Sequence, residues 1–235
     1  MKRKELLLEV CANGLESAIN AQRSGAHRIE LCEQLEVGGV TPAFELIEKA
    51  RALLSIPIHV LIRPRAGDFF YSDDDFKRMR DEINAAKRLG ANGVVFGILN
   101  RDCSVDTERC KELIEFASPI LSVFHRAFDV VSNPFIALDE LIGLGFSHVL
   151  TSGQKETVAD GISLIRQLVQ HADHRITILA GGGITEENIA ELVAQSGTNE
   201  FHFSAKVRKK DGILVSDEKR IRMIIKRAQN SWNMV

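Results

Sequence analysis

The segment LLLEVCANGLESAINAQRSGAHRIELC, Leu6–Cys32, contains two short apolar runs separated by a stretch with helical spacing. The runs, Leu6–Cys11 and Arg28–Cys32, have the length of buried β-strands. Between them, an apolar pattern of helical period starts at Leu15 and stops at Gly25, as in a helix that ends at a C-terminal glycine. The segment therefore predicts a strand–helix–strand unit with parallel strands.

The same alternation continues to the end of the 235-residue chain. Six further strands are expected, at Ile58–Ile62, Gly93–Phe96, Leu121–His125, His148–Thr151, Ile176–Ala180 and Glu200–Phe203. Seven further helices are expected, at Pro42–Leu54, Ser72–Gly90, Asp106–Ala117, Asn133–Leu144, Val158–Gln170, Glu187–Ser196 and Asp217–Asn230. Eight such units predict one α/β domain over residues 1–235, folded as a closed (β/α)8 TIM barrel. The alternative is an open doubly wound sheet, and the absence of G-x-G-x-x-G after the first strand argues against it.

Several helix ends carry capping signals. Thr41 is a candidate N-cap with Pro42 at the first helical position, and Ser72 followed by Asp75 resembles a capping arrangement for the third helix. Three helices are followed by a glycine just before the next strand, at Gly25, Gly90 and Gly145.

Composition narrows the class of protein. Hydrophobic residues make up 45% and charged residues 26% of the chain, and the net charge is -2, so nothing favours binding to nucleic acid or to an anionic membrane. No apolar run approaches the roughly 20 residues that span a bilayer. The start, Met1–Glu5, leads straight into an apolar strand without the features of a secretory signal. We therefore expect a cytoplasmic protein with reduced cysteines.

Polar side chains gather where the expected strands end, which is where the chemistry of (β/α)8 barrels lies. Glu9 and Cys11 share one face of the first strand, because residues two apart point the same way, and Glu30 and Cys32 repeat this on the second strand. Neighbouring strands lie about 4.8 Å apart, so two carboxylates and two thiols can converge. Other strand ends supply Arg63, Arg65, His125, Asp129, Gly181, Gly182, Gly183 and Ser204.

These residues suggest acid–base chemistry. Glu9 and Glu30 are candidates for proton exchange, and Arg63 can neutralise one of the two carboxylates. His125 is a candidate general base or metal ligand, with Asp129 orienting it. The alternatives are ion pairs that only stabilise the barrel and, for His125, a core histidine with satisfied hydrogen bonds. His202 is a weaker candidate. The histidines assigned no function are His27, His59, His148, His171 and His174.

The turn Gly181–Gly183 is a candidate anion site, together with Ser204 after the last strand. Three glycines let backbone N–H groups approach an anion, and many barrels bind phosphate after strands 7 and 8. Arg63 or Arg65 could hold a second anionic group. The alternative is a tight turn that needs glycine for its positive φ.

Cys11 and Cys32 are the candidate metal ligands, because two thiolates suit Cu(I). The alternative is that these cysteines are simply small apolar residues in the core. The four cysteines lack the CxxC spacing of a zinc site, and Cys103 and Cys110 have no evident partner.

Taken together, motifs over nearly the whole chain resemble the CutC family. They are Glu9–Cys11, Arg28–Cys32, Gly38–Pro42, Ile62–Arg65, Gly67–Phe69, Tyr71–Asp73, Phe124–Asp129, Leu150–Gly153, Gly181–Ile184 and Glu200–His202. The resemblance implies a (β/α)8 barrel, a cytosolic copper homeostasis protein, and a homodimer or higher homo-oligomer. It also implies that Cys11 and Cys32 are the Cu(I) ligands. Some members of the family carry a further cysteine where this chain has Phe203.

Two functions are therefore weighed. The first is a copper homeostasis protein of the CutC type that binds Cu(I) at the C-terminal mouth of the barrel through Cys11 and Cys32. The alternative is a TIM-barrel enzyme doing acid–base chemistry on a small phosphorylated or carboxylated metabolite, with anion binding at Gly181–Gly183 and Ser204. A third possibility is an interaction protein without chemistry, and the dense polar strand ends argue against it.

Overall fold

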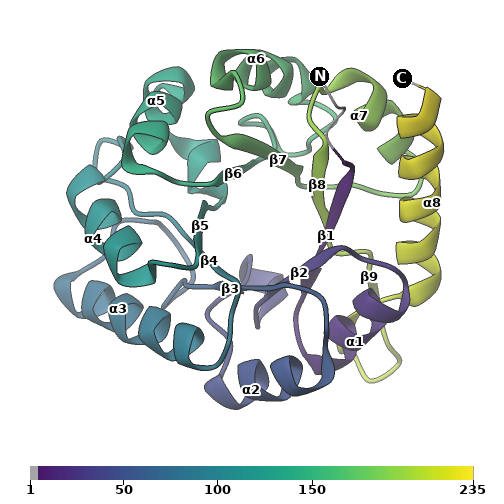
Figure 1. The fold of residues 1–235 in the computed structure, drawn as a ribbon, viewed down its shortest axis with the longest axis horizontal. Helices are drawn as coiled ribbons and strands as arrows, with labels where there is room; N and C mark the ends of the chain where they lie inside the picture. The colour runs from purple at the N-terminus through teal and green to yellow at the C-terminus, as the bar shows by residue number, and fades with distance from the viewer. Residues whose placement is uncertain (1–4, 235) are drawn as a thin grey trace.

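The computed structural model describes residues 5–234, which form a closed barrel of eight parallel strands (Figure 1). The strands pair in chain order, and β8 pairs with β1 to close the barrel. Their bounds are β1 Leu7–Ala12, β2 Arg28–Leu31, β3 Ile58–Leu61, β4 Gly93–Phe96, β5 Leu121–Phe124, β6 His148–Thr151, β7 Thr177–Gly181 and β8 Glu200–Phe203. The predicted (β/α)8 TIM barrel is confirmed, and the ends of each predicted strand agree to within one residue.

A ring of helices surrounds the barrel (Figure 1). Their bounds are α1 Leu15–Arg23, α2 Phe44–Leu53, α3 Asp73–Arg88, α4 Thr107–Ala117, α5 Pro134–Leu144, α6 Ile162–Ala172, α7 Ile189–Gln195 and α8 Glu218–Met234. Two short 3-10 helices, η1 Leu35–Val37 and η2 Arg126–Val130, follow β2 and β5. Within residues 5–234 no helix is both long and apolar enough to cross a membrane.

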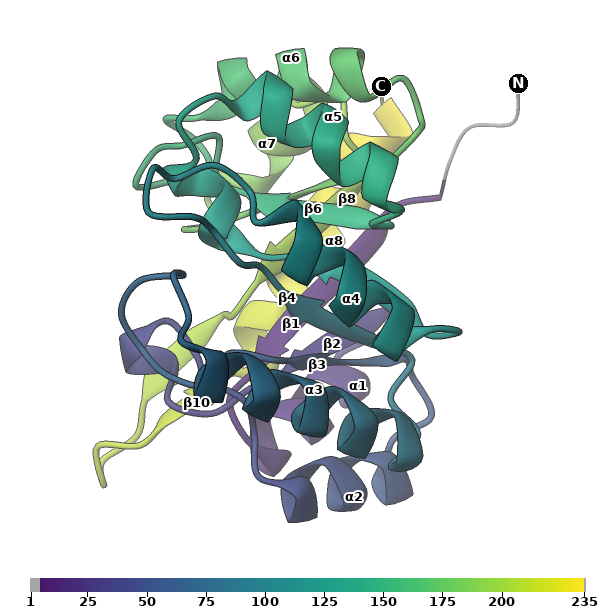
Figure 2. The same cartoon turned by 90° about the vertical axis from the view of Figure 1, so that its left-hand side faces the viewer.

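The sequence patterns did not predict a small antiparallel hairpin after β8. It consists of β9 Lys206–Arg208 and β10 Leu214–Ser216, and Figure 2 shows it projecting at the lower left. The hairpin is anchored to α1 and the loop before it, because Ser216 N donates to Ser17 Oγ at 3.0 Å and Asn13 Nδ2 donates to Leu214 O at 2.9 Å.

Two kinds of predicted helix cap are confirmed. Ser72 and Asp75 form a reciprocal capping box at the start of α3, in which each side chain accepts a hydrogen bond from the other residue's backbone N–H. The three glycines that follow helices all adopt left-handed φ values, of +87° at Gly25, +85° at Gly90 and +90° at Gly145.

The predicted cap of α2 is wrong. The helix begins at Phe44, and Thr41 lies before it. Thr41 Oγ1 instead donates to Glu82 Oε2 at 2.6 Å and accepts from the backbone N–H of Arg63 at 2.8 Å. Its hydroxyl is therefore used to tie the loop after β2 to α3 and to the end of β3.

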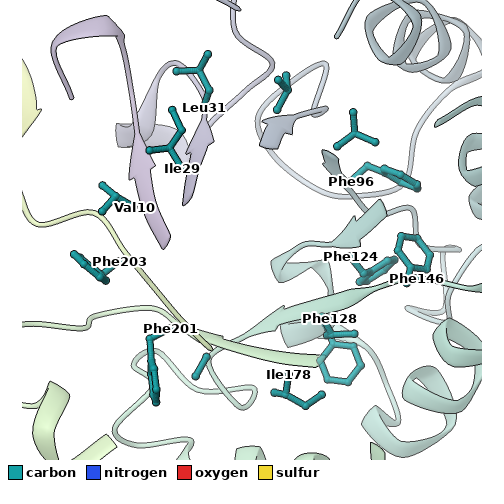
Figure 3. Packing of buried hydrophobic residues seen from close by; sticks show 14 of the residues in the cluster. Val10, Ile29, Leu31, Phe96, Phe124, Phe128, Phe146, Ile178, Phe201 and Phe203 are labelled. Atoms are coloured by element: carbon teal, nitrogen blue, oxygen red, sulfur yellow. The ribbon is translucent and has the colours of Figure 1, made fainter. Parts of the chain in front are cut away.

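Apolar side chains fill two separate regions. The larger core lies between the strands and the helices, where Phe146 packs against the rings of Phe96 and Phe124 with centroids 5.2 and 5.3 Å apart (Figure 3). A smaller cluster of buried side chains, separate from that core, brings together Cys11, Cys32, Leu61, Val95 and Val123. The candidate thiols are therefore part of this second cluster.

The strand register positions the thiols. Cys11 pairs with Glu30, and Glu9 pairs with Arg28. The two Glu-x-Cys phrases are therefore offset by two residues, as the shear of a closed barrel requires. Cys32 follows β2 and donates its backbone N–H to Ala12 O at 3.0 Å.

Candidate metal and ligand site

The two candidate thiols lie in contact at the mouth of the barrel. Cys11 Sγ is 3.7 Å from Cys32 Sγ and 3.6 Å from Glu30 Oε1. All three side chains are buried. The expected convergence of thiols is therefore present, with the carboxylate of Glu30 beside it.

His202 joins this group from the last strand of the barrel. The ligand atoms of Cys11, Glu30 and His202 all lie within 4.8 Å of one another. His202 reaches this position because β8 pairs with β1, which sets it opposite Glu9. From the sequence alone, His202 is a weaker candidate than His125. The available signal was its spacing of two from Glu200, which repeats the spacing of the Glu-x-Cys phrases.

The electrostatic environment sets the protonation of this group. Burial alone would lower the pKa of His202, but Glu30, Cys11 and Glu9 outweigh it, so the pKa of His202 lies well above its ordinary value. The hydrogen bond with Cys32, followed by burial, raises the pKa of Cys11 well above its ordinary value. Burial likewise raises the pKa of Glu30. A metal ion that binds Cys11 and His202 must therefore displace protons.

Charged side chains continue this group into the barrel interior. Glu9 forms an ion pair with Arg28 and accepts from His202 Nδ1 at 2.7 Å. Arg28 Nη2 also reaches Glu200 at 3.1 Å, and Glu200 lies 3.2 Å from His148 Nε2. Burial would raise the pKa of Glu9, but Arg28 and His202 outweigh it and hold this pKa far below its ordinary value.

This network corrects two expectations. Arg28, and not Arg63, neutralises the buried Glu9. His59 and His148, to which we assigned no function, belong to the same network, since His59 Nδ1 lies 3.5 Å from Glu9 Oε2. Burial lowers the pKa of His59 to about 4, so its ring is neutral.

A cavity of about 680 Å³ opens over the Cys11 thiol at the C-terminal ends of the strands. Its polar lining consists of Cys11, Glu30, Arg63, His125, Arg126, Asp129, Gly182, Gly183, Thr185, His202, Ser204, Lys206 and Arg220. Among the described residues, four of the predicted site residues do not line it: Glu9, Cys32, Arg65 and Gly181.

His125 lines this cavity with one free ring nitrogen. Its Nδ1 accepts from the backbone N–H of Ala127 at 3.2 Å. Within residues 5–234, its Nε2 has no hydrogen-bond partner, although the residue is only 4% exposed. Burial, assisted by the nearby Arg63, lowers the pKa of His125 to about 3. The ring is therefore neutral, and because Nδ1 is an acceptor, the proton lies on Nε2.

Asp129 does not orient His125 in the way we expected. Its carboxylate accepts from Thr151 Oγ1 at 2.5 Å and from Ser152 N at 3.0 Å, and it pairs with Arg126 Nε at 2.7 Å. Asp129 therefore fastens the loop after β6 to η2.

The glycine turn is explained by backbone geometry and close packing. Gly182 and Gly183 adopt φ values of +107° and +77°, which favour glycine. A side chain on Gly181 would crowd Leu150 and His202, and one on Gly182 would crowd Arg126. The tight-turn alternative thus accounts for Gly182 and Gly183, and close packing accounts for Gly181. Ser204 does line the same cavity.

Arg65 lies away from the cavity lining. Its guanidinium pairs with Asp68 Oδ1 at 2.8 Å and Asp75 Oδ2 at 3.2 Å, and its side chain is 36% exposed. The expectation that Arg65 binds an anion at the mouth is therefore not supported.

The neutral state of His125 predicts a pH-dependent stability. In the unfolded chain this residue takes up a proton below its ordinary pKa of 6.5, whereas the folded protein resists protonation down to about 3. The unfolded state binds more protons between these values, so stability falls as pH falls through this window. Replacing His125 with Asn keeps an acceptor for Ala127 N and removes the titration.

We therefore expect wild type to lose up to about 1.4 kcal/mol more per pH unit than His125→Asn below pH 6.5. Urea unfolding of both proteins at several pH values from neutral to mildly acid measures this difference. Parallel stability profiles would show that His125 does not resist protonation in the folded state.

Fold and site together define a class of protein: a single (β/α)8 barrel whose mouth carries a thiol pair, a carboxylate and an imidazole beneath an open cavity. The model of the CutC family matches residues 6–207. The chain belongs to the CutC family.

Named relatives agree with this assignment. The chain is 44% identical to the copper homeostasis protein cutC homolog of Homo sapiens over 207 residues, covering 88% of this chain and 76% of that protein. It is 47% identical to a family protein CutC of Pasteurella multocida, covering 85% of this chain and 82% of that protein.

Solved structures agree as well. CutC from Streptococcus agalactiae superposes with a TM-score of 0.81 at 35% identity, over 85% of this chain and 98% of that one. A phosphoribosylanthranilate isomerase from Pyrococcus furiosus, with a TM-score of 0.63 at 14% identity over 96% of this chain and 100% of that one, shares the fold alone.

Proposed function

We propose that this protein binds Cu(I) at the mouth of its barrel as part of copper homeostasis, with Cys11 as the central ligand. The contact of 3.7 Å between Cys11 Sγ and Cys32 Sγ carries the proposal. Thiolates are soft ligands that favour Cu(I), and the names of the relatives, which include a copper homeostasis protein, point the same way.

The spacing of the sulfurs favours a third ligand. Metal–sulfur bonds of about 2.3 Å would separate two sulfurs by roughly 4.6 Å in a linear arrangement. The observed 3.7 Å is shorter and suits a bent arrangement that leaves a position open. His202 is the best candidate for that position, because its ligand atom lies within 4.8 Å of those of Cys11 and Glu30.

A cytoplasmic location belongs to the same proposal. A reducing compartment keeps neighbouring thiols reduced, which a Cu(I) site requires. The proposal also includes a homodimer or higher homo-oligomer, which rests on the family resemblance and is tested by sedimentation.

Acid–base catalysis receives less support. Of the three candidate carboxylates, Glu9 is held by Arg28, and Asp129 by Arg126 and Ser152. Glu30 alone of these lines the cavity without an arginine partner among the described residues. His125, with its pKa of about 3, is a weak base.

Replacing Cys11 with Ser tests the copper proposal. We expect the Cu(I) affinity of Cys11→Ser to fall by about a hundredfold and that of Cys32→Ser by about tenfold. The loss is larger for Cys11 because it contacts Cys32 and also belongs to the group with Glu30 and His202. Anaerobic competition with a chromophoric Cu(I) chelator measures both affinities.

Cys103→Ser is the matched control, because Cys103 is an exposed thiol outside the site. Its affinity is expected to equal that of the wild type. Unchanged affinity in both Cys11→Ser and Cys32→Ser would refute the proposal, as would an equal loss in all three variants.

A further inference from the structure

Arg63 is a buried cation with no carboxylate partner among the described residues. It is 6% exposed, and its two terminal nitrogens donate to the carbonyl oxygens of Val37, Gly39 and Gly67. Within residues 5–234 it forms no ion pair, and its Nε has no hydrogen-bond partner. A buried charge without a counter-charge is costly, so this position calls for an anion.

His125 supplies a second unused donor beside it. Phe69 is close to both side chains, with its ring centroid 5.3 Å from Arg63 Cζ and 4.8 Å from the imidazole centroid of His125. The Nε2–H of His125 is buried and has no partner among the described residues. Arg63, His125 and Phe69 all line the cavity.

The other arginines of the cavity are already neutralised. Arg126 pairs with Asp129, and Arg220 pairs with Glu186 at 2.8 Å. The opposing carboxylate in the lining is Glu30, whose Oε1 accepts from the thiol of Cys11. Within residues 5–234, Arg63 is therefore the buried cation of the lining that has no carboxylate partner, and Lys206, which also lines the cavity without an ion pair, is exposed.

We propose that the cavity binds a small organic anion whose carboxylate or phosphate oxygens accept hydrogen bonds from Arg63 Nε and His125 Nε2. Its volume of about 680 Å³ exceeds what an oxyanion alone would fill. Apolar walls from Leu35, Leu61, Leu150 and Ile184 suit a short carbon skeleton. This site uses none of the proposed copper ligands, so anion binding can be tested independently of copper binding.

Calorimetric titration of the metal-free full chain tests the proposal with three probes: malonate, glycerol 3-phosphate and inorganic phosphate. We expect saturable one-to-one binding of malonate or glycerol 3-phosphate. The probe that binds more tightly shows whether the site prefers a carboxylate or a phosphate group. Inorganic phosphate should bind more weakly than glycerol 3-phosphate, because it leaves the apolar walls uncovered.

Three variants locate the binding. Arg63→Met should weaken the stronger probe by about a hundredfold, and His125→Asn, which keeps the acceptor for Ala127 N, by about tenfold. Arg65→Met is the matched control, because Arg65 is two residues away but pairs with Asp68 and Asp75 outside the cavity lining. It should bind like wild type. Urea unfolding of each variant separates loss of the site from loss of the fold.

The proposal fails if none of the three probes saturates wild type, or if His125→Asn binds as tightly as wild type while folded. It also fails if Arg65→Met weakens binding as much as Arg63→Met, which would indicate general electrostatic attraction. Cu(I) titration of His125→Asn reports separately on the copper site and is expected to match wild type.

Discussion

Arg28→Met is expected to lower the free energy of unfolding by about 3–5 kcal/mol, the range for a buried ion pair that loses one partner. Arg28 is 5% exposed and holds both Glu9 and Glu200. Methionine has a similar length but no charge, so Glu200 would lose its arginine and Glu9 would keep His202 as its cationic partner. Urea unfolding at neutral pH measures the change.

Two further variants make this test specific. Arg65→Met removes a partly exposed ion pair and is expected to cost less than about 1 kcal/mol. Adding Glu9→Gln to Arg28→Met removes the buried charge of Glu9 and should recover part of the lost free energy of unfolding. A loss in Arg28→Met no larger than that in Arg65→Met would show that the interior network contributes little.

Gly161→Ala is the second change expected to have a large effect. A methyl group on Gly161 would overlap the backbone carbonyl of Ser152, and a backbone group cannot rotate away as a side chain can. We expect a loss of about 3 kcal/mol, at the upper end for overpacking. The strain would also displace Ser152, which donates to Asp129 at the cavity wall.

Gly143→Ala is the control for this substitution. Gly143 lies inside α5, and a methyl group there meets nothing within 4 Å. Alanine should therefore stabilise the helix by about 1 kcal/mol. Thermal unfolding of the two variants should give melting temperatures that move in opposite directions. A Gly161→Ala variant as stable as wild type would contradict the close contact between Gly161 and the backbone of Ser152.

The fold was predictable because its signals are local. Apolar runs, helical periods and the glycines at 25, 90 and 145 recur along the chain, and each can be recognised from its immediate neighbours. The hairpin of β9 and β10 was missed because each strand has three residues and neither shows a sustained apolar alternation. The N-cap prediction at Thr41 was wrong because its hydroxyl donates a hydrogen bond to Glu82, which lies far along the chain.

The site was predictable only in part, since the barrel brings distant residues together. The Glu-x-Cys phrases pointed correctly to Cys11, Cys32 and Glu30. His202 contacts Glu9 across 193 positions of sequence, and this contact exists only because β8 closes on β1. Which arginine reaches Glu9 depends on barrel shear, and no local pattern distinguishes Arg28 from Arg63.

The layer of ion pairs inside the barrel determines from which side a ligand can reach Cys11. Glu9, Arg28, His59, His148 and Glu200 are each less than a tenth exposed and fill the interior on the N-terminal side of the thiols. The N-terminal end of the barrel is therefore closed to Cys11. Any ligand of Cys11 would enter and leave through the cavity at the C-terminal ends of the strands, so exchange of one ligand for another would be sequential.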